Sequence, residues 1–221
     1  MDISIDKARF NMIQQQIRPW NVTDNEVLSV MAEIPRERFV PAAYRNLAYA
    51  DLEIPISEGQ IMLAPKVVAH MLQALAIQPH DKILQLGTGT GYITACLCRL
   101  GGHVVGMELH AELAEQTRTG LQALKPRRLK VRVGNGLAES VEGHPFDVIA
   151  VTGSLPDATA LETLETQLAP GGRLFAIVGE EPIMEAQLVT RIADRDFRRR
   201  SLLETCVPAL EKTPKPERFV F

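Results

Sequence analysis

A glycine-rich turn is the clearest chemical signal in the sequence. Gly87, Gly89 and Gly91 directly follow the apolar run Ile83–Leu86 and directly precede a helical stretch that begins near Tyr92. Glycines at alternate positions let the backbone turn sharply and approach a ligand closely, and the N-terminus of the helix beyond presents unpaired N–H groups. The pattern favours a ligand-binding turn over a tight turn with a purely structural role.

The acidic residue Glu108 gives a second signal, because it ends the next apolar run along the chain, 103–107. A carboxylate at this place in a doubly wound fold accepts hydrogen bonds from ribose hydroxyls. A surface glutamate without a ligand is the alternative. The Gly-x-Gly-x-Gly spacing differs from the Gly-x-Gly-x-x-Gly pattern that cradles a pyrophosphate, so a nucleoside is favoured over a dinucleotide such as NAD.

A third signal is Asn135 between Gly134 and Gly136, directly after another apolar run. A flat adenine ring fits against backbone without side chains, and the Asn135 amide has the groups to meet the edge of a base. A plain Asn-Gly turn is an equally good interpretation of these three residues.

Short apolar runs alternate with amphipathic stretches of helix length along this part of the chain. This alternation predicts strands joined by right-handed crossover helices in a mostly parallel sheet, which would position the three signals. We therefore expect an α/β, doubly wound domain over residues 81–221. The expected strands are 82–87, 103–108, 129–134, 146–153 and 171–179, and the expected helices are 92–100, 111–124 and 158–168.

Residues 1–80 have a helical pattern and are expected to form an N-terminal segment packed on this core. Thr23 is the predicted N-cap of one helix, with Glu26 completing a capping box and with Val22 and Val27 as a hydrophobic staple. A second helix is predicted to begin at Pro65. After residue 186, further apolar runs without a crossover helix suggest an antiparallel hairpin at the sheet edge.

Composition excludes several classes of protein. A formal net charge of -3 gives no global attraction to nucleic acid or to an anionic membrane. The apolar runs are too short to span a bilayer, and the first ten residues lack the apolar core of a signal peptide, so a cytoplasmic location is expected. The three cysteines are expected to be reduced, and the five histidines show no metal-ligand spacing with them.

The sequence also resembles the protein-L-isoaspartate O-methyltransferase family along most of its length. The distinctive part of the resemblance is N-terminal and comprises Ile34–Pro41, Ala48–Asp51 and Pro55–Gln60. The glycine turn, Glu108, Gly134–Gly136, Phe146–Ile149 and Gln167–Leu174 resemble the core that many such enzymes share.

This resemblance implies a class I, Rossmann-like methyltransferase that uses S-adenosylmethionine to methylate a carboxylate, which in the family is the isoaspartyl group of damaged proteins. A protein or peptide, or a small-molecule carboxylate, is then the expected partner. Gln60 and Leu63 are the expected substrate-pocket residues, and no catalytic residue is assigned. The expected cofactor-binding residues are Gln85, Gly87, Thr88, Gly89, Gly91, Tyr92, Glu108, Leu109, Gly134, Asn135 and Gly136.

The sequence departs from the family where its Thr-Ile-Ser-x-Pro stretch usually stands, because this chain has Ile61–Pro65 without a hydroxyl. Leu63 replaces the serine that is taken as the active-site hydroxyl and cannot donate a hydrogen bond to a carboxylate. Gln85 and Asn135 stand where acidic residues are common in the family. We therefore expect weak or absent isoaspartyl methylation, with backbone N–H groups or Gln60 as substitute donors.

Two alternatives remain at this stage. The first is a protein that binds S-adenosylmethionine and has lost or altered catalysis. The second, an NAD-dependent oxidoreductase, rests only on the generic fold and the glycine turn.

Overall fold

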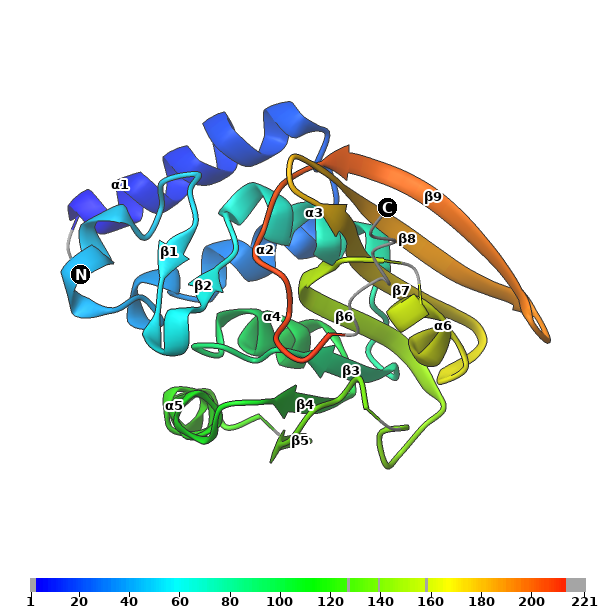
Figure 1. Ribbon diagram of the computed structural model, residues 1–221. Helices are drawn as coiled ribbons and strands as arrows, with labels where there is room; N and C mark the ends of the chain where they lie inside the picture. The colour runs from blue at the N-terminus through cyan, green and yellow to red at the C-terminus, as the bar shows by residue number, and fades with distance from the viewer. Residues whose placement is uncertain (1–2, 127, 139, 158, 214–221) are drawn as a thin grey trace, which may run out of the picture.

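A seven-stranded sheet forms the centre of the computed structural model (Figure 1). The structure describes residues 3–126, 128–138, 140–157 and 159–213. The strand order is β5-β4-β3-β6-β7-β8-β9, in which the first five are parallel and the last two are antiparallel. This confirms the doubly wound, mostly parallel α/β fold with an antiparallel C-terminal edge. The strands are β3 (Lys82–Leu86), β4 (His103–Glu108), β5 (Leu129–Val133), β6 (Phe146–Leu155), β7 (Leu168–Glu180), β8 (Ile183–Ala193) and β9 (Asp196–Glu204).

Helices cover both faces of the sheet. They are α1 (Ile3–Asn11), α2 (Asn25–Glu33), α3 (Pro65–Leu75), α4 (Tyr92–Leu100), α5 (Ala111–Leu121) and α6 (Thr159–Glu165). The crossover helix α4 and the start of α3 agree with the predictions, whereas α6 is shorter than expected because β7 already begins at Leu168.

The sheet residues alternate between two buried clusters, as the two-residue period of a strand requires. On one face, Ile83 and Val148 pack with residues of α2, α3 and α4. On the other face, Leu84 and Ile149 pack with residues of α6. Because both faces are buried, the central strands read as continuous apolar runs in the sequence.

The N-cap prediction for α2 was wrong by one residue. Asp24 is the N-cap, and its Oδ1 accepts hydrogen bonds from the N–H groups of Glu26 and Val27 over 2.9 and 3.2 Å. The N–H of Thr23 instead donates to Gln73 Oε1 on α3, over 2.8 Å. This long-range contact places Thr23 outside the helix, and a carboxylate caps the positive end of the helix dipole well.

A small hairpin outside the main sheet brings the N-terminal segment to the carboxyl ends of the strands. β1 (Ile54–Pro55) pairs antiparallel with β2 (Ile61–Met62), and the turn between them includes Glu58 at φ +60°. This hairpin carries Gln60 and Leu63, the two residues expected in the substrate pocket, toward the glycine turn: an added Cβ at Gly89 would lie 3.4 Å from Ile56 Cδ1.

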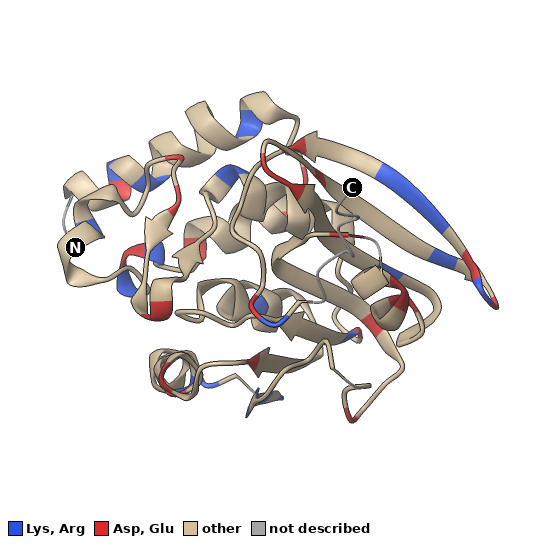
Figure 2. Ribbon diagram, in the orientation of Figure 1, with Lys and Arg blue, Asp and Glu red and all other residues tan. Residues whose placement is uncertain are grey.

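The C-terminal hairpin of β8 and β9 confirms the predicted antiparallel edge, while the last apolar run, 218–221, lies outside the described residues. Figure 2 shows basic residues along this hairpin and at its tip. Arg198 and Arg200 are exposed, and Arg199 pairs with Glu165 over 2.6 Å. The basic run 195–200 therefore forms a solvated edge, which is a common way to protect an edge strand.

Candidate functional site

The glycine turn between β3 and α4 adopts left-handed backbone conformations. Gly87, Gly89 and Gly91 have φ values of 81°, 54° and 92°. A Cβ at Gly87 would lie 2.5 Å from Thr152 Oγ1, the hydroxyl that donates to the carbonyl oxygens of Leu86 and Gly87 over 2.8 and 2.6 Å. Both the backbone angles and the close approach of β6 thus require glycine.

Glu108 is the last residue of β4, and its carboxylate stabilises the glycine turn through hydrogen bonds. Its Oε2 accepts hydrogen bonds from the Gly89 N–H over 2.8 Å and from Thr88 Oγ1 over 3.4 Å. Its Oε1 accepts from the N–H of His110 over 3.2 Å. The side chain is only 5% exposed, yet a carboxylate has about four acceptor positions, so Glu108 retains capacity for ligand hydroxyls.

Gln85 lies under the turn, outside the pocket lining. Its amide donates to the carbonyl oxygen of Gly87 over 2.9 Å, and its Oε1 accepts from Thr94 Oγ1 over 2.8 Å. The residue is fully buried. Its contacts therefore attach β3 and α4 to the turn itself.

The Asn135 side chain is engaged in its own turn, since Oδ1 accepts a hydrogen bond from the Leu137 N–H over 3.0 Å. A Cβ at Gly136 would lie 2.4 Å from Leu86 Cδ2 and 3.1 Å from Met107 Cβ. Packing against the ends of β3 and β4 thus explains the glycine. Both of the interpretations drawn from the sequence for this segment remain compatible with the geometry.

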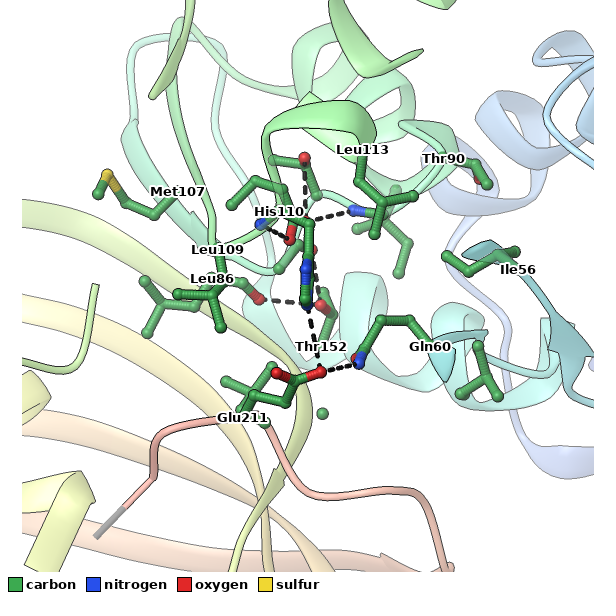
Figure 3. A pocket seen from close by; sticks show the side chains of 18 of the residues that line it. Ile56, Gln60, Leu86, Thr90, Met107, Leu109, His110, Leu113, Thr152 and Glu211 are labelled. Carbon is green, nitrogen blue, oxygen red and sulfur yellow. Dashed lines mark hydrogen bonds and ion pairs between the residues drawn. The ribbon is translucent and has the colours of Figure 1, made fainter. Parts of the chain in front are cut away.

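A pocket opens where these segments meet at the carboxyl ends of the parallel strands (Figure 3). Of the predicted residues, the lining includes Gln60, Leu63, Gly87, Thr88, Gly89, Tyr92, Glu108, Leu109, Gly134, Asn135 and Gly136. Gln85 and Gly91 are not part of the lining. The carboxyl ends of parallel strands are the usual ligand site of this architecture.

Several lining residues had no site prediction, including Arg36, Ile56, Thr90, His110, Thr152 and Glu211. Arg36 was noted only as part of the run that carries the family resemblance. The chain before Glu211 was noted only as an apolar run. Neither residue stands beside the glycine turn in the sequence, so no local signal assigned them to the pocket.

Arg36 connects the hairpin to α4. Its Nε donates to the carbonyl oxygen of Ala48 and its Nη2 to that of Leu63, both over 2.9 Å. The guanidinium carbon lies 4.8 Å from the centre of the Tyr92 ring. Arg36 is completely buried, and burial lowers its pKa below the ordinary value of an arginine. Burial also raises the pKa of Tyr92 well above 10.0, so the ring remains neutral.

The part of the pocket lined by the residues after Gln60 is apolar. Leu63 is only 1% exposed, and its neighbours Ile61 and Met62 also line the pocket. The Gln60 amide is committed elsewhere, because it donates to the Glu58 carbonyl oxygen over 3.1 Å and to Glu211 Oε1 over 2.6 Å. Gln60 would have to give up one of these bonds to serve as the substitute donor proposed from the sequence.

In the described part of the chain, no group of three or more histidine, cysteine or acidic residues is arranged to hold a metal ion. None of the helices within that part has the length and apolar character needed to cross a membrane.

Comparisons with known proteins agree with the resemblance found in the sequence. Residues 7–213 match the family model described as Protein-L-isoaspartate(D-aspartate) O-methyltransferase. A protein-L-isoaspartate O-methyltransferase of Koribacter versatilis is 41% identical over 92% of this chain and 89% of its own length. One from Aeropyrum pernix is 38% identical over 90% of this chain and 77% of its own length.

Solved structures show the same fold at lower identity. A Plasmodium falciparum protein, solved in complex with S-adenosyl-L-homocysteine, matches with a TM-score of 0.78 and 21% identity, covering 94% of this chain and 98% of the other. A structure of a protein-L-isoaspartate O-methyltransferase matches with a TM-score of 0.77 and 23% identity, covering 95% and 67%. On the strength of the sequence matches, this chain belongs to the protein-L-isoaspartate(D-aspartate) O-methyltransferase family.

Proposed function

We propose that this chain transfers a methyl group from S-adenosylmethionine to a carboxylate, and that its acceptor is the isoaspartyl group of a protein or peptide. The observation that carries the proposal is the family match over residues 7–213, combined with the Glu108 carboxylate beside the glycine turn. The family assignment leaves the oxidoreductase alternative without support. We further propose that its partner is a protein or peptide and neither nucleic acid nor a membrane, and that it acts in the cytoplasm.

The residues of the pocket fit S-adenosylmethionine in kind. Glu108 would accept hydrogen bonds from the ribose hydroxyls, because it is fixed by backbone N–H groups and faces the pocket. The apolar side chains of Leu86, Met107 and Leu137 would pack around the adenine ring beside Asn135. The glycines of the turn would let the backbone approach the rest of the molecule.

The chemistry asks for alignment more than for acid or base groups. When bound, S-adenosylmethionine supplies an electrophilic methyl group on a sulfonium that is already a good leaving group. An ionised carboxylate is a competent nucleophile without loss of a proton. The residues of this chain would therefore hold the acceptor in line with the methyl group and exclude water.

The wall formed by Ile61, Met62 and Leu63 is the feature that argues against fast isoaspartyl methylation. A carboxylate that enters the pocket there loses water without gaining a hydroxyl donor, and desolvation of an unpaired charge is costly. This wall favours the second candidate function, a protein that binds S-adenosylmethionine with lost or altered catalysis. A small-molecule carboxylate is the alternative acceptor.

Two measurements on the natural protein test the proposal. Calorimetry with S-adenosylmethionine, S-adenosylhomocysteine and NAD is expected to show binding of the first two only. Incubation with labelled S-adenosylmethionine and an isoaspartyl peptide is expected to give methyl ester at a low rate because of the apolar wall, with the matched aspartyl peptide as control. Cofactor binding without label on the isoaspartyl peptide would support the second candidate. NAD binding alone would overturn both.

A further inference from the structure

Three segments that are far apart in the sequence meet at one carboxylate on the rim of the pocket. Glu211 Oε1 accepts a hydrogen bond from Gln60 Nε2 over 2.6 Å and lies 3.2 Å from His110 Nε2 (Figure 3). Gln60 belongs to the β1–β2 hairpin, His110 precedes α5, and Glu211 belongs to the C-terminal segment. All three side chains line the pocket.

Glu211 is held in place by the backbone just before it. The N–H of Ser154 on β6 donates to the carbonyl oxygen of Pro208 over 3.0 Å, and the Leu210 N–H donates back to the Ser154 carbonyl oxygen over 2.9 Å. The Ser154 hydroxyl adds a bond to the carbonyl oxygen of Val207 over 3.1 Å. The carboxylate therefore extends from a segment that is anchored on the sheet.

The two partners of Glu211 lie on the two sides of the pocket: Gln60 lies beside the proposed acceptor site, and His110 lies beside the proposed cofactor site. Gln60 directly precedes Ile61, the first residue of the apolar wall on the proposed acceptor side. The backbone N–H of His110 donates a hydrogen bond to Glu108 over 3.2 Å, so His110 contacts the residue that is proposed to bind the ribose of the cofactor. A second carboxylate, Glu58 Oε2, lies 3.5 Å from His110 Nδ1 and strengthens the link between hairpin and α5.

We infer that Glu211 is a positioning residue for methyl transfer: it clamps the acceptor wall of the hairpin over the bound cofactor. This inference rests on the proposed function. With the Gln60 and His110 contacts in place, the hairpin and the cofactor side of the pocket are held in one arrangement. Loss of these contacts would free the hairpin, and misplacement of an acceptor by about 1 Å costs on the order of a hundredfold in rate.

The solvent exposure of His110 and Glu211 allows the positioning role to be distinguished from a role in stabilising the fold. The side chains of His110 and Glu211 are 20% and 46% exposed. Exposed ion pairs contribute about 0–1 kcal/mol to folding. Removal of the Glu211 carboxylate should therefore hardly change stability, while it should change the release of the cofactor and the rate of transfer.

The test compares the natural protein with Glu211→Ala, Glu211→Gln and the control Glu115→Ala. Glu115 is an exposed glutamate on α5 whose carboxylate pairs with Arg118 over 3.0 Å and does not line the pocket. The measurements are the thermal midpoint, the dissociation rate of S-adenosylhomocysteine in stopped flow, and kcat and KM with an isoaspartyl peptide.

We expect an unchanged thermal midpoint in Glu211→Ala, release of S-adenosylhomocysteine about three- to tenfold faster, and a fall in kcat wherever turnover is measurable. Glu211→Gln should recover part of the effect, since its amide oxygen still accepts a hydrogen bond. In the double variant with Gln60→Ala, the two effects should be less than additive, because both changes break the same contact.

The results distinguish failure of the clamp from failure of the proposed function. Natural protein that binds S-adenosylhomocysteine, together with Glu211→Ala that releases it at the natural rate, would overturn the clamp and leave the proposed function standing. Natural protein that binds neither S-adenosylmethionine nor S-adenosylhomocysteine would overturn both. A large drop in thermal midpoint in Glu211→Ala, absent in Glu115→Ala, would reassign Glu211 to a structural role.

Discussion

The Gly89 N–H donates a hydrogen bond to Glu108 Oε2 over 2.8 Å, so the acidic end of β4 and the glycine turn after β3 form one unit. Glu108 therefore has two tasks in the proposed function. It supports the turn through its hydrogen bonds to Thr88 and Gly89, and it would accept hydrogen bonds from the ribose. A variant of Glu108 can therefore change both the stability of the turn and the affinity for the cofactor.

The first prediction is that Glu108→Ala weakens binding of S-adenosylhomocysteine by roughly tenfold to a hundredfold, because hydrogen bonds to a charged group contribute about 1.5–3 kcal/mol. Calorimetry measures the dissociation constant, and circular dichroism checks that the variant is folded. Glu108→Gln should bind with intermediate affinity, since it keeps one acceptor oxygen. A folded Glu108→Ala protein with natural affinity would remove Glu108 from the site.

The second prediction concerns the acceptor wall. The double change Ile61→Thr with Leu63→Ser should raise methylation of an isoaspartyl peptide above that of the natural protein, because it places hydroxyl donors beside the entering carboxylate. Methyl ester formation is measured after equal affinity for S-adenosylhomocysteine has been shown. Turnover by the natural protein at least as fast as by the double variant would show that the hydroxyl is dispensable.

The third prediction is that Arg36→Met destabilises the fold by roughly 2–4 kcal/mol, since the buried carbonyl oxygens of Ala48 and Leu63 lose their donors. Arg36→Lys should be less destabilising, because an ammonium group still provides donors. Urea unfolding gives both values. Because methionine is similar in length and removes a buried charge, natural stability in Arg36→Met would mean that desolvation of the guanidinium outweighs its hydrogen bonds.

The fourth prediction uses the three free thiols. Burial raises the pKa of Cys96 and of Cys98 to about 12, while Cys206 is exposed. A thiol reagent at pH 8 should therefore modify one thiol rapidly in the folded protein and all three in urea. Cys206→Ser should abolish the rapid phase. Rapid reaction in that variant would contradict the burial of the other two.

The raised pKa values of Cys96 and Cys98 also make the stability of the fold depend on pH. A folded-state pKa above the unfolded value of 9.0 means that folding favours the neutral thiol. The contribution is fully present below pH 9 and is lost as the pH rises toward 12. Unfolding free energies at pH 8 and pH 10 should differ less in Cys96→Ala than in the natural protein, and an equal difference would exclude this thiol as a cause.

The sequence by itself determined the features that depend on neighbouring residues. The two-residue period of buried strands and the alternation with helical stretches predicted the parallel sheet, and the order of β3, the glycine turn and α4 is continuous in the chain. Glu108 was found because a parallel sheet places the ends of successive strands at one edge. These predictions needed no knowledge of how distant segments pack.

Only the tertiary structure decided which distant residues join the pocket and which near ones do not. Gln60, His110 and Glu211 come together because the hairpin and the C-terminal segment pack onto the strand ends. Glu211 lies 151 residues from Gln60 and 101 residues from His110 in the sequence, so there is no local pattern to find. Gln85 shows the converse. It directly precedes the turn in the strand, but its side chain lies under the turn and bonds to Gly87 and Thr94. A side chain's direction and partners depend on the packing around it, and that packing is set by the whole fold.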